Sequence, residues 1–519
     1  MILTDPQNKT PIPGIGGRAT LDDLFRRAAA RRPDAVALVD PPNRQVFTDG
    51  AARRLTYAQA DRMISAIAGR LRRIGLHTDA IVGLQLANTV ESVLTLLAVL
   101  RAGLIAMPLP LLWRRADAVA ALGRVGAHAL IVHGRIGAAN HIDTALQVAA
   151  EIFSIRHVAA FGSALPDGVV ALDDLYGADV LDLFPAVEHE RTAGPGPGAH
   201  LALITWDVAA EGLAPVARSH SELIAGGLAA LLESRIEQDT VILSTLTMST
   251  FAGLAVSLVP WLLVGGTLAL HHPFDVAAFD AQRKSLRCAV AVVPGPLVAQ
   301  LSEAGQFVAA DGLKRVLSVW RAPERLPRAP AWRDGAIALI DVQVFGETGL
   351  IAARRGPSGK PVAIAFGPVP APRGVVGSLI VGEVRATPKG TVALRGPMVP
   401  RCAFPPGAER TAVPAFKVSA NGFVDTGYAC GMNMPALAVT GPPPGLVSVG
   451  GYRFVVRDLW EIVGMVASEA TLAALPDALA GHRLAGSAAD RDRVQEALTR
   501  LGVNPLLVGA FRDRRRPAA

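Results

Sequence analysis

The chain has 519 residues, which is too long for one compact domain and suits two or three. Hydrophobic residues make up 51% of it and the mean hydropathy is +0.35, which supplies a large core and excludes a mostly disordered chain. The net charge is +7, and the basic residues are scattered singly except in the tail, at Arg512 and Arg514 to Arg516. Only 5% of the residues are aromatic, and this pattern argues against a nucleic-acid partner.

Helices and strands are predicted to alternate in the first part of the chain. The expected helices are residues 19–31, 54–75 and 91–103, and the expected buried strands are residues 80–86 and 104–108. Thr20 is a suitable N-cap for the first helix, and Gly75 and Gly103 are placed to end the other two. This alternation predicts a parallel sheet covered by helices.

The segment 240–274 contains no Asp, Glu, Lys or Arg and is long enough to cross a membrane. Pro260 and the pair Gly265-Gly266 interrupt it, and Ser and Thr residues dilute its first half. We therefore expect a buried helix followed by a buried strand, and no integral membrane span.

The three cysteines (Cys288, Cys402 and Cys430) have no CxxC spacing and fit a reducing compartment. The first residues, MILTDPQNKTPIPG, lack a basic region followed by an apolar stretch, so we expect no secretory signal and a cytoplasmic location. The pair His271-His272 has no accompanying Cys, Asp or Glu pattern, and no metal site is predicted.

Residues 440–454 read TGPPPGLVSVGGYRF and resemble the interdomain hinge of the adenylate-forming enzymes, the superfamily of acyl-CoA synthetases and AMP-dependent ligases. The family pattern has an arginine that contacts ribose, a hinge acid or lysine, and a second lysine. Those positions hold Pro442, Gly445 and Ser448 here. Further segments that resemble the family in the same order are 56–62, 84–110, 253–275, 288–301, 313–326 and 392–400.

The resemblance covers about residues 19–510 and implies an α/β fold. It implies a large domain, residues 1–440, made of stacked mixed sheets with helices, and a small α+β lid, residues 441–519. The proline-rich residues 441–445 are the expected boundary. A helix is predicted at 488–502 in the lid.

The family's phosphate-binding loop corresponds to residues 201–220, where Thr205, Gly212 and Arg218 are the nucleotide-site equivalents. A phosphate loop needs small residues and free backbone N–H groups. Trp206, Asp207 and Glu211 add bulk and negative charge to it. We expect this loop not to hold a triphosphate in the usual way, and Arg218 to be solvated.

Two further family motifs are altered. In VFGETGL the residues Phe345, Gly346 and Thr348 match, but Gly349 replaces the glutamate that holds magnesium, and we expect Glu347 to be a surface carboxylate on a retained turn. In the ribose motif, Tyr428 replaces the aspartate and Asp425 stands three residues earlier.

The catalytic lysine of the family's small domain has no counterpart, because the chain contains no lysine after Lys417. Arginines of the tail could supply charge but not the same geometry. The resemblance also implies an acyl pocket, with Thr250, Gly253 and Trp320 as candidates, and its unusually apolar surroundings favour a hydrophobic ligand.

Three functions remain open on these residues. The first is a degenerate member in which ATP-dependent carboxylate activation is impaired or lost and which keeps a ligand-binding or regulatory role. The second is a divergent but active acid–thiol ligase for a hydrophobic carboxylic acid, with Arg218, Thr348 and the tail arginines holding phosphates. The third is a non-catalytic subunit that binds a partner protein. ATP, magnesium and CoA are cofactors by resemblance only.

Overall fold

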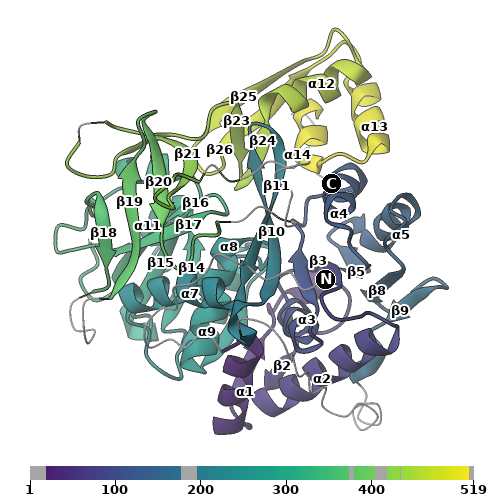
Figure 1. Cartoon of the computed structure of the whole chain (residues 1–519), viewed down its shortest axis with the longest axis horizontal. Helices are drawn as coiled ribbons and strands as arrows, with labels where there is room; N and C mark the ends of the chain where they lie inside the picture. The colour runs from purple at the N-terminus through teal and green to yellow at the C-terminus, as the bar shows by residue number, and fades with distance from the viewer. Residues whose placement is uncertain are drawn as a thin grey trace.

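The computed structural model describes residues 19–176, 196–372, 379–401, 404, 416, 418–432 and 434–512. Cys402 and the arginines 514–516 therefore lie outside the described residues. Figure 1 shows two large sheets with their helices, a smaller antiparallel sheet beside them, and a C-terminal unit above the end of the β10–β11 hairpin.

The first large sheet has seven strands in the order β11-β10-β4-β3-β5-β8-β9. Its strands are β3 Ile81–Gln85, β4 Ile105–Pro108, β5 Ala129–His133, β8 His157–Phe161, β9 Val169–Ala171, β10 Leu201–Ala209 and β11 Gly212–Ser219. All neighbouring pairs are parallel except β10 and β11. The helices between them are α2 Tyr57–Arg73, α3 Val90–Arg101, α4 Arg115–Val125 and α5 His141–Glu151.

The predicted helix–strand alternation is confirmed, with one correction at the start of α2. Residues 54–56 form the strand β2 (Arg54–Thr56), which pairs with β1 (Val36–Val39), so the helix begins at Tyr57. Thr56 caps it by accepting a hydrogen bond from the Gln59 N–H. The helix ends at Arg73, and Gly75 follows with a φ of +94°.

The second large sheet has eight strands in the order β17-β16-β15-β14-β12-β13-β1-β2. Its other strands are β12 Val241–Ser244, β13 Thr267–Leu270, β14 Val290–Pro294, β15 Arg315–Trp320, β16 Ala338–Phe345 and β17 Gly349–Arg354. Its helices are α1 Leu21–Arg31, α7 His220–Ser234, α8 Phe251–Gly253, a π-helical turn Leu254–Leu258, α9 Val259–Val264, α10 Val276–Ser285 and α11 Gly295–Glu303. Thr20 caps α1, as its sequence predicts.

The uncharged segment 240–274 forms β12, the buried helical residues 251–264 and β13, which confirms the expected buried helix and strand. The helical part packs against α7 through two glycines. A Cβ on Gly226 would lie 2.6 Å from the Phe251 ring, and one on Gly227 2.2 Å from Val259. Among the described residues, no helix combines the length and the apolar character that crossing a membrane requires.

The remaining sheets are antiparallel. A five-stranded sheet contains β18 Gly367–Pro370, β19 Ile380–Ala386, β20 Thr391–Arg395, β21 Val424–Cys430 and β22 Val439–Gly441. A four-stranded sheet contains β23 Leu446–Val449, β24 Tyr452–Val455, β25 Thr471–Asp477 and β26 Gly481–Ser487, with the helices α12 Val456–Val466, α13 Arg491–Leu501 and α14 Pro505–Val508. A two-stranded ribbon joins β6 Arg135–Ile136 and β7 Ala139–Asn140.

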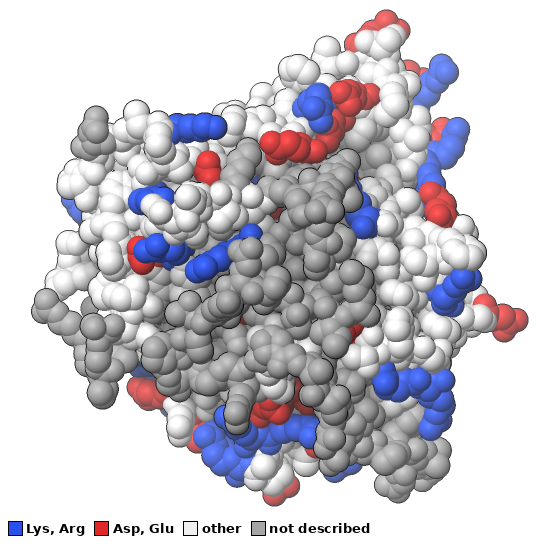
Figure 2. Space-filling view, in the orientation of Figure 1, with Lys and Arg blue, Asp and Glu red and all other residues white. Residues whose placement is uncertain are grey.

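The chain passes from the five-stranded to the four-stranded sheet between Gly441 and Leu446, within the segment expected to be the hinge. The four-stranded sheet has its own hydrophobic cluster, in which Leu459, Leu498 and Phe511 are buried. Residues 446–512 are called the C-terminal unit below. On the face shown in Figure 2, basic and acidic side chains of the described residues are intermixed.

Candidate functional site

The segment expected to be a phosphate loop is a tight β-hairpin. Residues of β10 and β11 pair in register from Ile204 opposite Ala217 to Ala209 opposite Gly212, which leaves only Ala210 and Glu211 in the turn. Gly212 has a φ of +117°, a conformation that suits glycine. An antiparallel ladder engages backbone N–H groups with carbonyls of the opposite strand. The hairpin therefore offers few free N–H groups to a phosphate chain.

Arg218 is buried on β11, so the expectation that it is solvated is wrong. Its Nη2 donates to the carbonyl oxygens of Glu347 and Thr348, the latter at 3.2 Å, and its guanidinium lies 4.0 Å above the Phe251 ring. Burial lowers the pKa of Arg218 to about 10, which still leaves it charged at neutral pH. The side chain of Thr205 lies beside it, with Oγ1 3.5 Å from Nη1. Arg218 thus fastens the hairpin to the turn between β16 and β17.

The turn between β16 and β17 carries the altered VFGETGL motif. Phe345 pairs with Gly349, and Gly346 has a φ of +60°. The expectation of a surface carboxylate at Glu347 is wrong, because this side chain is only 2% exposed. Its Oε2 accepts a hydrogen bond of 2.6 Å from the Phe251 N–H, and burial raises its pKa. Thr348 is buried as well.

Asp207 binds the groups around this turn. Its Oδ2 accepts a hydrogen bond of 2.9 Å from the Glu347 N–H, and its Oδ1 forms an ion pair of 2.8 Å with Nη1 of Arg453 on β24. A Cβ on Gly346 would lie 2.1 Å from Oδ2 of Asp207, so the contact needs glycine there. Arg453 also donates to the Tyr428 hydroxyl, which in turn donates to the Arg321 carbonyl at 3.3 Å. We call Asp207, Arg453 and Tyr428 the interdomain cluster.

Three other predicted nucleotide-site or hinge residues lie apart from the interdomain cluster. Asp425 is on β21 opposite Ala393, and its Oδ1 accepts a hydrogen bond of 2.9 Å from the Gly427 N–H. Pro442 lines a second cavity of about 960 Å³, which shares part of its wall, including Trp320 and Arg325, with the cavity described next. Gly445 has a φ of +76°, and its carbonyl accepts a hydrogen bond from Val456.

A cavity of about 580 Å³ lies between the large sheets and the C-terminal unit. Its wall includes two predicted acyl-pocket residues, Thr250 and Trp320, but not Gly253. Gly253 instead allows close approach of the Thr247 carbonyl, which a Cβ there would meet at 2.0 Å. The apolar lining consists of Pro110, Leu111, Leu112, Trp113, Trp206, Val208, Leu246, Pro294, Pro296, Leu297, Val319, Trp320, Ala322, Leu479 and Ala480.

Three tryptophans shape this cavity. The rings of Trp113 and Trp206 are 5.9 Å apart and tilted by 60°. Trp320 is fixed by a hydrogen bond of 3.2 Å from its Nε1 to Asp341, which pairs with the buried Arg355. Trp320 also lies against Gly295, where a Cβ would approach the indole to 2.3 Å. Among these three, only Trp320 was expected from the sequence.

Arginines supply the charge of the cavity wall. Arg325 donates to the carbonyls of Ala478 and Leu479 and so holds the C-terminal unit. Arg321 also lines the cavity, and burial lowers its pKa although Glu347 and Asp207 oppose this through space. Within the described parts of the chain, no hydrogen bond or ion pair engages the Arg321 guanidinium. Arg321 carries no local sequence pattern that would single it out.

The C-terminal unit contacts the rest of the molecule at further points. The Tyr452 hydroxyl accepts a hydrogen bond of 3.2 Å from the Leu112 N–H, and the Gly502 carbonyl one of 3.0 Å from Ala116. Ser448, at the position of the family's hinge lysine, faces Arg453 across β23 and β24 and lines the cavity. The tail arginines 514–516 lie outside the described residues.

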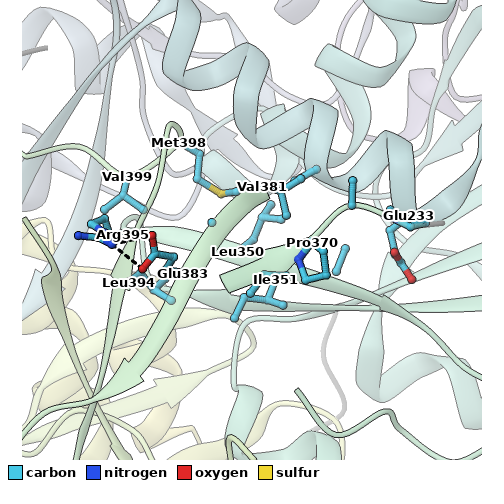
Figure 3. A pocket seen from close by; sticks show the side chains of 16 residues that line it. Glu233, Leu350, Ile351, Pro370, Val381, Glu383, Leu394, Arg395, Met398 and Val399 are labelled. Carbon is cyan, nitrogen blue, oxygen red and sulfur yellow. Dashed lines mark hydrogen bonds and ion pairs between the residues drawn. The ribbon is translucent and has the colours of Figure 1, made fainter. Parts of the chain in front are cut away.

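Other candidate sites are weaker. A cavity of only about 30 Å³ lies between β17, β19 and β20, and Figure 3 shows the side chains that line it, with Arg395 paired to Glu383. Over the described ranges, no group of three or more His, Cys, Asp or Glu side chains could hold a metal ion. Cys288 and Cys430 are buried free thiols.

Comparison with known proteins decides the family. The model of the AMP-binding enzyme family matches residues 25–353. The chain belongs to this family. Its fold is similar to that of Mycobacterium smegmatis MbtA, with a TM-score of 0.64 and 21% identity over 96% of this chain and 93% of that one. It is also similar to the amide bond synthetase McbA from Marinactinospora thermotolerans, with a TM-score of 0.69 and 19% identity over 93% and 94% of the two chains. The adenylate-forming fold expected from the sequence is therefore confirmed.

Curated relatives match over a short segment only. Tyrocidine synthase 1 of Brevibacillus parabrevis is 35% identical over 92 residues, which are 18% of this chain and 7% of that protein. The beauvericin nonribosomal cyclodepsipeptide synthetase BEA1 of Gibberella fujikuroi is 32% identical over 90 residues, or 17% of this chain and 3% of that protein. The chain thus spans less than a tenth of these relatives.

Proposed function

We propose that this protein is a member of the AMP-binding enzyme family that does not adenylate its ligand and instead binds a small hydrophobic molecule in the 580 Å³ cavity. The observation that carries the proposal is the position of the Asp207 carboxylate. It already neutralises Arg453 and accepts the Glu347 N–H, two groups that could otherwise receive an anion.

ATP with magnesium does not fit the residues present. A triphosphate needs several donors and a cation aimed at the charge that develops during transfer. At the β10–β11 hairpin, backbone N–H groups are already paired with carbonyls of the opposite strand. The Asp207 carboxylate is held there as well, and its negative charge repels phosphate. The Arg218 guanidinium is turned to backbone carbonyls, and the described residues hold no carboxylate cluster for a metal ion. Loss of a single well-placed donor typically costs about 10²–10³ in rate.

The cavity supports a retained binding role. Its volume falls in the range of about 300–1,000 Å³ that is typical of small-molecule sites, and apolar surface makes up most of its wall. Trp320 is held by the buried Asp341–Arg355 pair. A rigid aromatic wall of this kind reduces the entropy lost on binding. CoA stays a prediction from the family resemblance.

The proposal is tested by calorimetric titration with ATP and magnesium, followed by acid-dependent ATP–pyrophosphate exchange. We expect no binding heat up to about 10 mM ATP, a concentration at which even a weak specific site of millimolar Kd would be mostly filled, and no exchange with any acid. Binding of ATP together with acid-dependent exchange would refute the proposal and establish an active ligase. A folded protein that binds neither nucleotide nor any small hydrophobic compound would favour the partner-binding function.

A matched variant tests whether the negative charge of Asp207 is what excludes phosphate. Asp207→Asn removes the negative charge and keeps an oxygen that can accept the Glu347 N–H. We expect this variant to bind inorganic pyrophosphate in the millimolar range, whereas the wild type shows no binding. Asp425→Asn is the control, because in the described part of the chain the Asp425 carboxylate accepts a hydrogen bond from the nearby Gly427 N–H and does not contact Arg453 or Glu347. Equal pyrophosphate binding by all three proteins would show that Asp207 does not exclude phosphate.

A further inference from the structure

The strand β25 forms one edge of the C-terminal unit. Its four-stranded sheet has the order β24-β23-β26-β25, and in the described part of the chain no strand pairs with the outer side of β25 (Figure 1). The opposite edge, β24, is covered, because its Tyr452 and Arg453 contact Leu112 and Asp207 of the large domain. β25 pairs with β26 over all of its 7 residues without a bulge. A regular edge strand of this kind is a template for pairing with another chain.

The sequence of β25 does little to protect this edge. Charged side chains, bulges and prolines are the usual devices that keep exposed edges from pairing. Residues 471–476 read TLAALP and contain no charged residue. All of them except Leu472 are exposed, including the apolar Leu475, which is 37% exposed. The edge is therefore open and uncharged for most of its length.

The hydrogen bonds of β26 show which residues of β25 face outward. The Gly450 N–H donates to the Ala480 carbonyl, so Ala480 faces β23 and the next residue, Gly481, faces β25. Gly481 pairs with Asp477, and alternate residues of a strand direct their backbone groups to the same side. The odd-numbered residues of β25 therefore bond to β26.

Three even-numbered residues, Leu472, Ala474 and Pro476, direct their backbone groups to the free edge. The position of Pro476 agrees with this assignment, because a proline in a sheet is placed where its missing N–H leaves no partner strand without a donor. Leu472 and Ala474 each offer an N–H and a carbonyl, and Pro476 offers a carbonyl. Ala474 is the midpoint of the strand, which runs from Thr471 to Asp477.

We propose that a second copy of this chain pairs antiparallel with β25 about a two-fold axis at Ala474, so that the two four-stranded sheets continue into one another. The two Ala474 residues then exchange two hydrogen bonds, and each Leu472 N–H donates to the carbonyl of the partner's Pro476. The proposal goes beyond the proposed function, since no residue of β25 lines the 580 Å³ cavity.

Charge favours a second copy as the occupant of this edge. Pairing about the two-fold axis sets Ala473 opposite the partner's Leu475 and Thr471 opposite the partner's Asp477. Like charges directly opposite each other destabilise a strand pair, and no mirrored pair within β25 brings two like charges together. The edge is thus complementary to itself, as the isologous interface of a two-fold dimer requires.

The test is sedimentation equilibrium of the full chain between about 5 and 500 μM. A small interface of this kind gives weak association, and we expect a dimer with a Kd on the order of 100 μM. Ala474→Lys and Ala474→Glu each place two like charges at the axis and should weaken the dimer at least about fivefold. An equimolar mixture of the two variants should associate at least about tenfold more tightly than either variant alone, because a lysine then faces a glutamate.

Thr499→Lys is the control, because Thr499 is exposed on α13 of the same unit and the variant adds the same charge away from the edge. Its Kd should stay within about twofold of the wild-type value, since salt screens distant surface charges. Circular dichroism and urea unfolding of each variant establish that it is folded, and the charge-swapped mixture separates a broken contact from a misfolded chain.

Three results would each overturn the proposal. The wild type could stay monomeric up to about 500 μM, which would leave no self-association of the expected strength. The dimer could form equally well in the Ala474 variants, which would place the contact elsewhere on the molecule. The mixture of the two charged variants could associate no better than either one alone, which would exclude pairing about Ala474.

Discussion

The ion pair between Asp207 and Arg453 links the hairpin of the large sheet to the C-terminal unit, and its strength can be measured by a double-mutant cycle. The side chain of Arg453 is 9% exposed and that of Asp207 is 22% exposed. Loss of one partner of a buried pair typically costs about 3–5 kcal/mol, and each hydrogen bond to a charged group contributes about 1.5–3 kcal/mol. Partial exposure of Asp207 reduces these values. We expect each single variant, Asp207→Asn or Arg453→Gln, to lose about 2–4 kcal/mol.

The cycle uses both single variants and the double variant in urea unfolding followed by tryptophan fluorescence. We expect a coupling energy of about 2–3 kcal/mol, because the second change then removes a group that the first has already left without its partner. If the C-terminal unit unfolds in a separate step, the coupling should appear in the step that undocks it.

The control cycle is the pair Arg500–Glu496 on α13, whose side chains are 75% and 72% exposed. A solvated pair four residues apart on a helix typically gives about 0.3–0.5 kcal/mol. If the coupling energy between Asp207 and Arg453 is as small as that of the control pair, the interpretation that this ion pair strongly stabilises the docking of the C-terminal unit is refuted.

Two further predictions concern stability. Burial lowers the pKa of His133 from 6.5 to about 4, so between these pH values the unfolded chain binds more protons than the folded chain. The neutral, buried His133 therefore contributes about 3 kcal/mol to the free energy of unfolding above pH 6.5, and this contribution is lost as the pH falls towards 4. His133→Asn keeps an acceptor for the Ala87 N–H, so its stability gap to the wild type should narrow from pH 7.5 to pH 4.5 in urea titrations, and a constant gap would contradict this. Gly346→Ala should cost at least about 2 kcal/mol more than Gly450→Ala, because both glycines have similar positive φ values (+60° and +57°) but only a Cβ at 346 meets Asp207. Equal losses in the two variants would show that the Asp207 contact is not tight.

Much of the fold follows from local patterns in the sequence. The capped helix beginning after Thr20, the buried strand at 81–85 and the helix ended by Gly502 lie where the sequence predicts them. These features depend on residues close in the chain, such as a side-chain cap or a glycine with positive φ. Residues 54–56 were assigned to a helix because their short strand depends on pairing with β1, which local pattern does not reveal.

The site was harder to predict, because its geometry depends on contacts over long sequence separations. Glu347 and Arg218 were expected on the surface, yet both are buried by packing of the β10–β11 hairpin on the turn between β16 and β17. Arg453 stands within the GGYRF stretch but was not expected as a site residue, because its partner Asp207 lies 246 positions away. Trp113 and Arg321 carry no local signal and are identified only by the cavity they line.

The interdomain cluster bears on the proposed function because the Asp207 carboxylate takes part in several contacts at once. A carboxylate at position 207 repels phosphate, but it also satisfies Arg453 and the Glu347 N–H, which would otherwise be left unpaired in a partly buried interface. In the proposed function, the same carboxylate also stabilises the contacts that hold the C-terminal unit beside the cavity. The aromatic wall and Arg321 line the cavity together with Asp207 and Arg453. We therefore infer that Asp207 underlies both parts of the proposed function, the exclusion of phosphate and the retention of the cavity beside it.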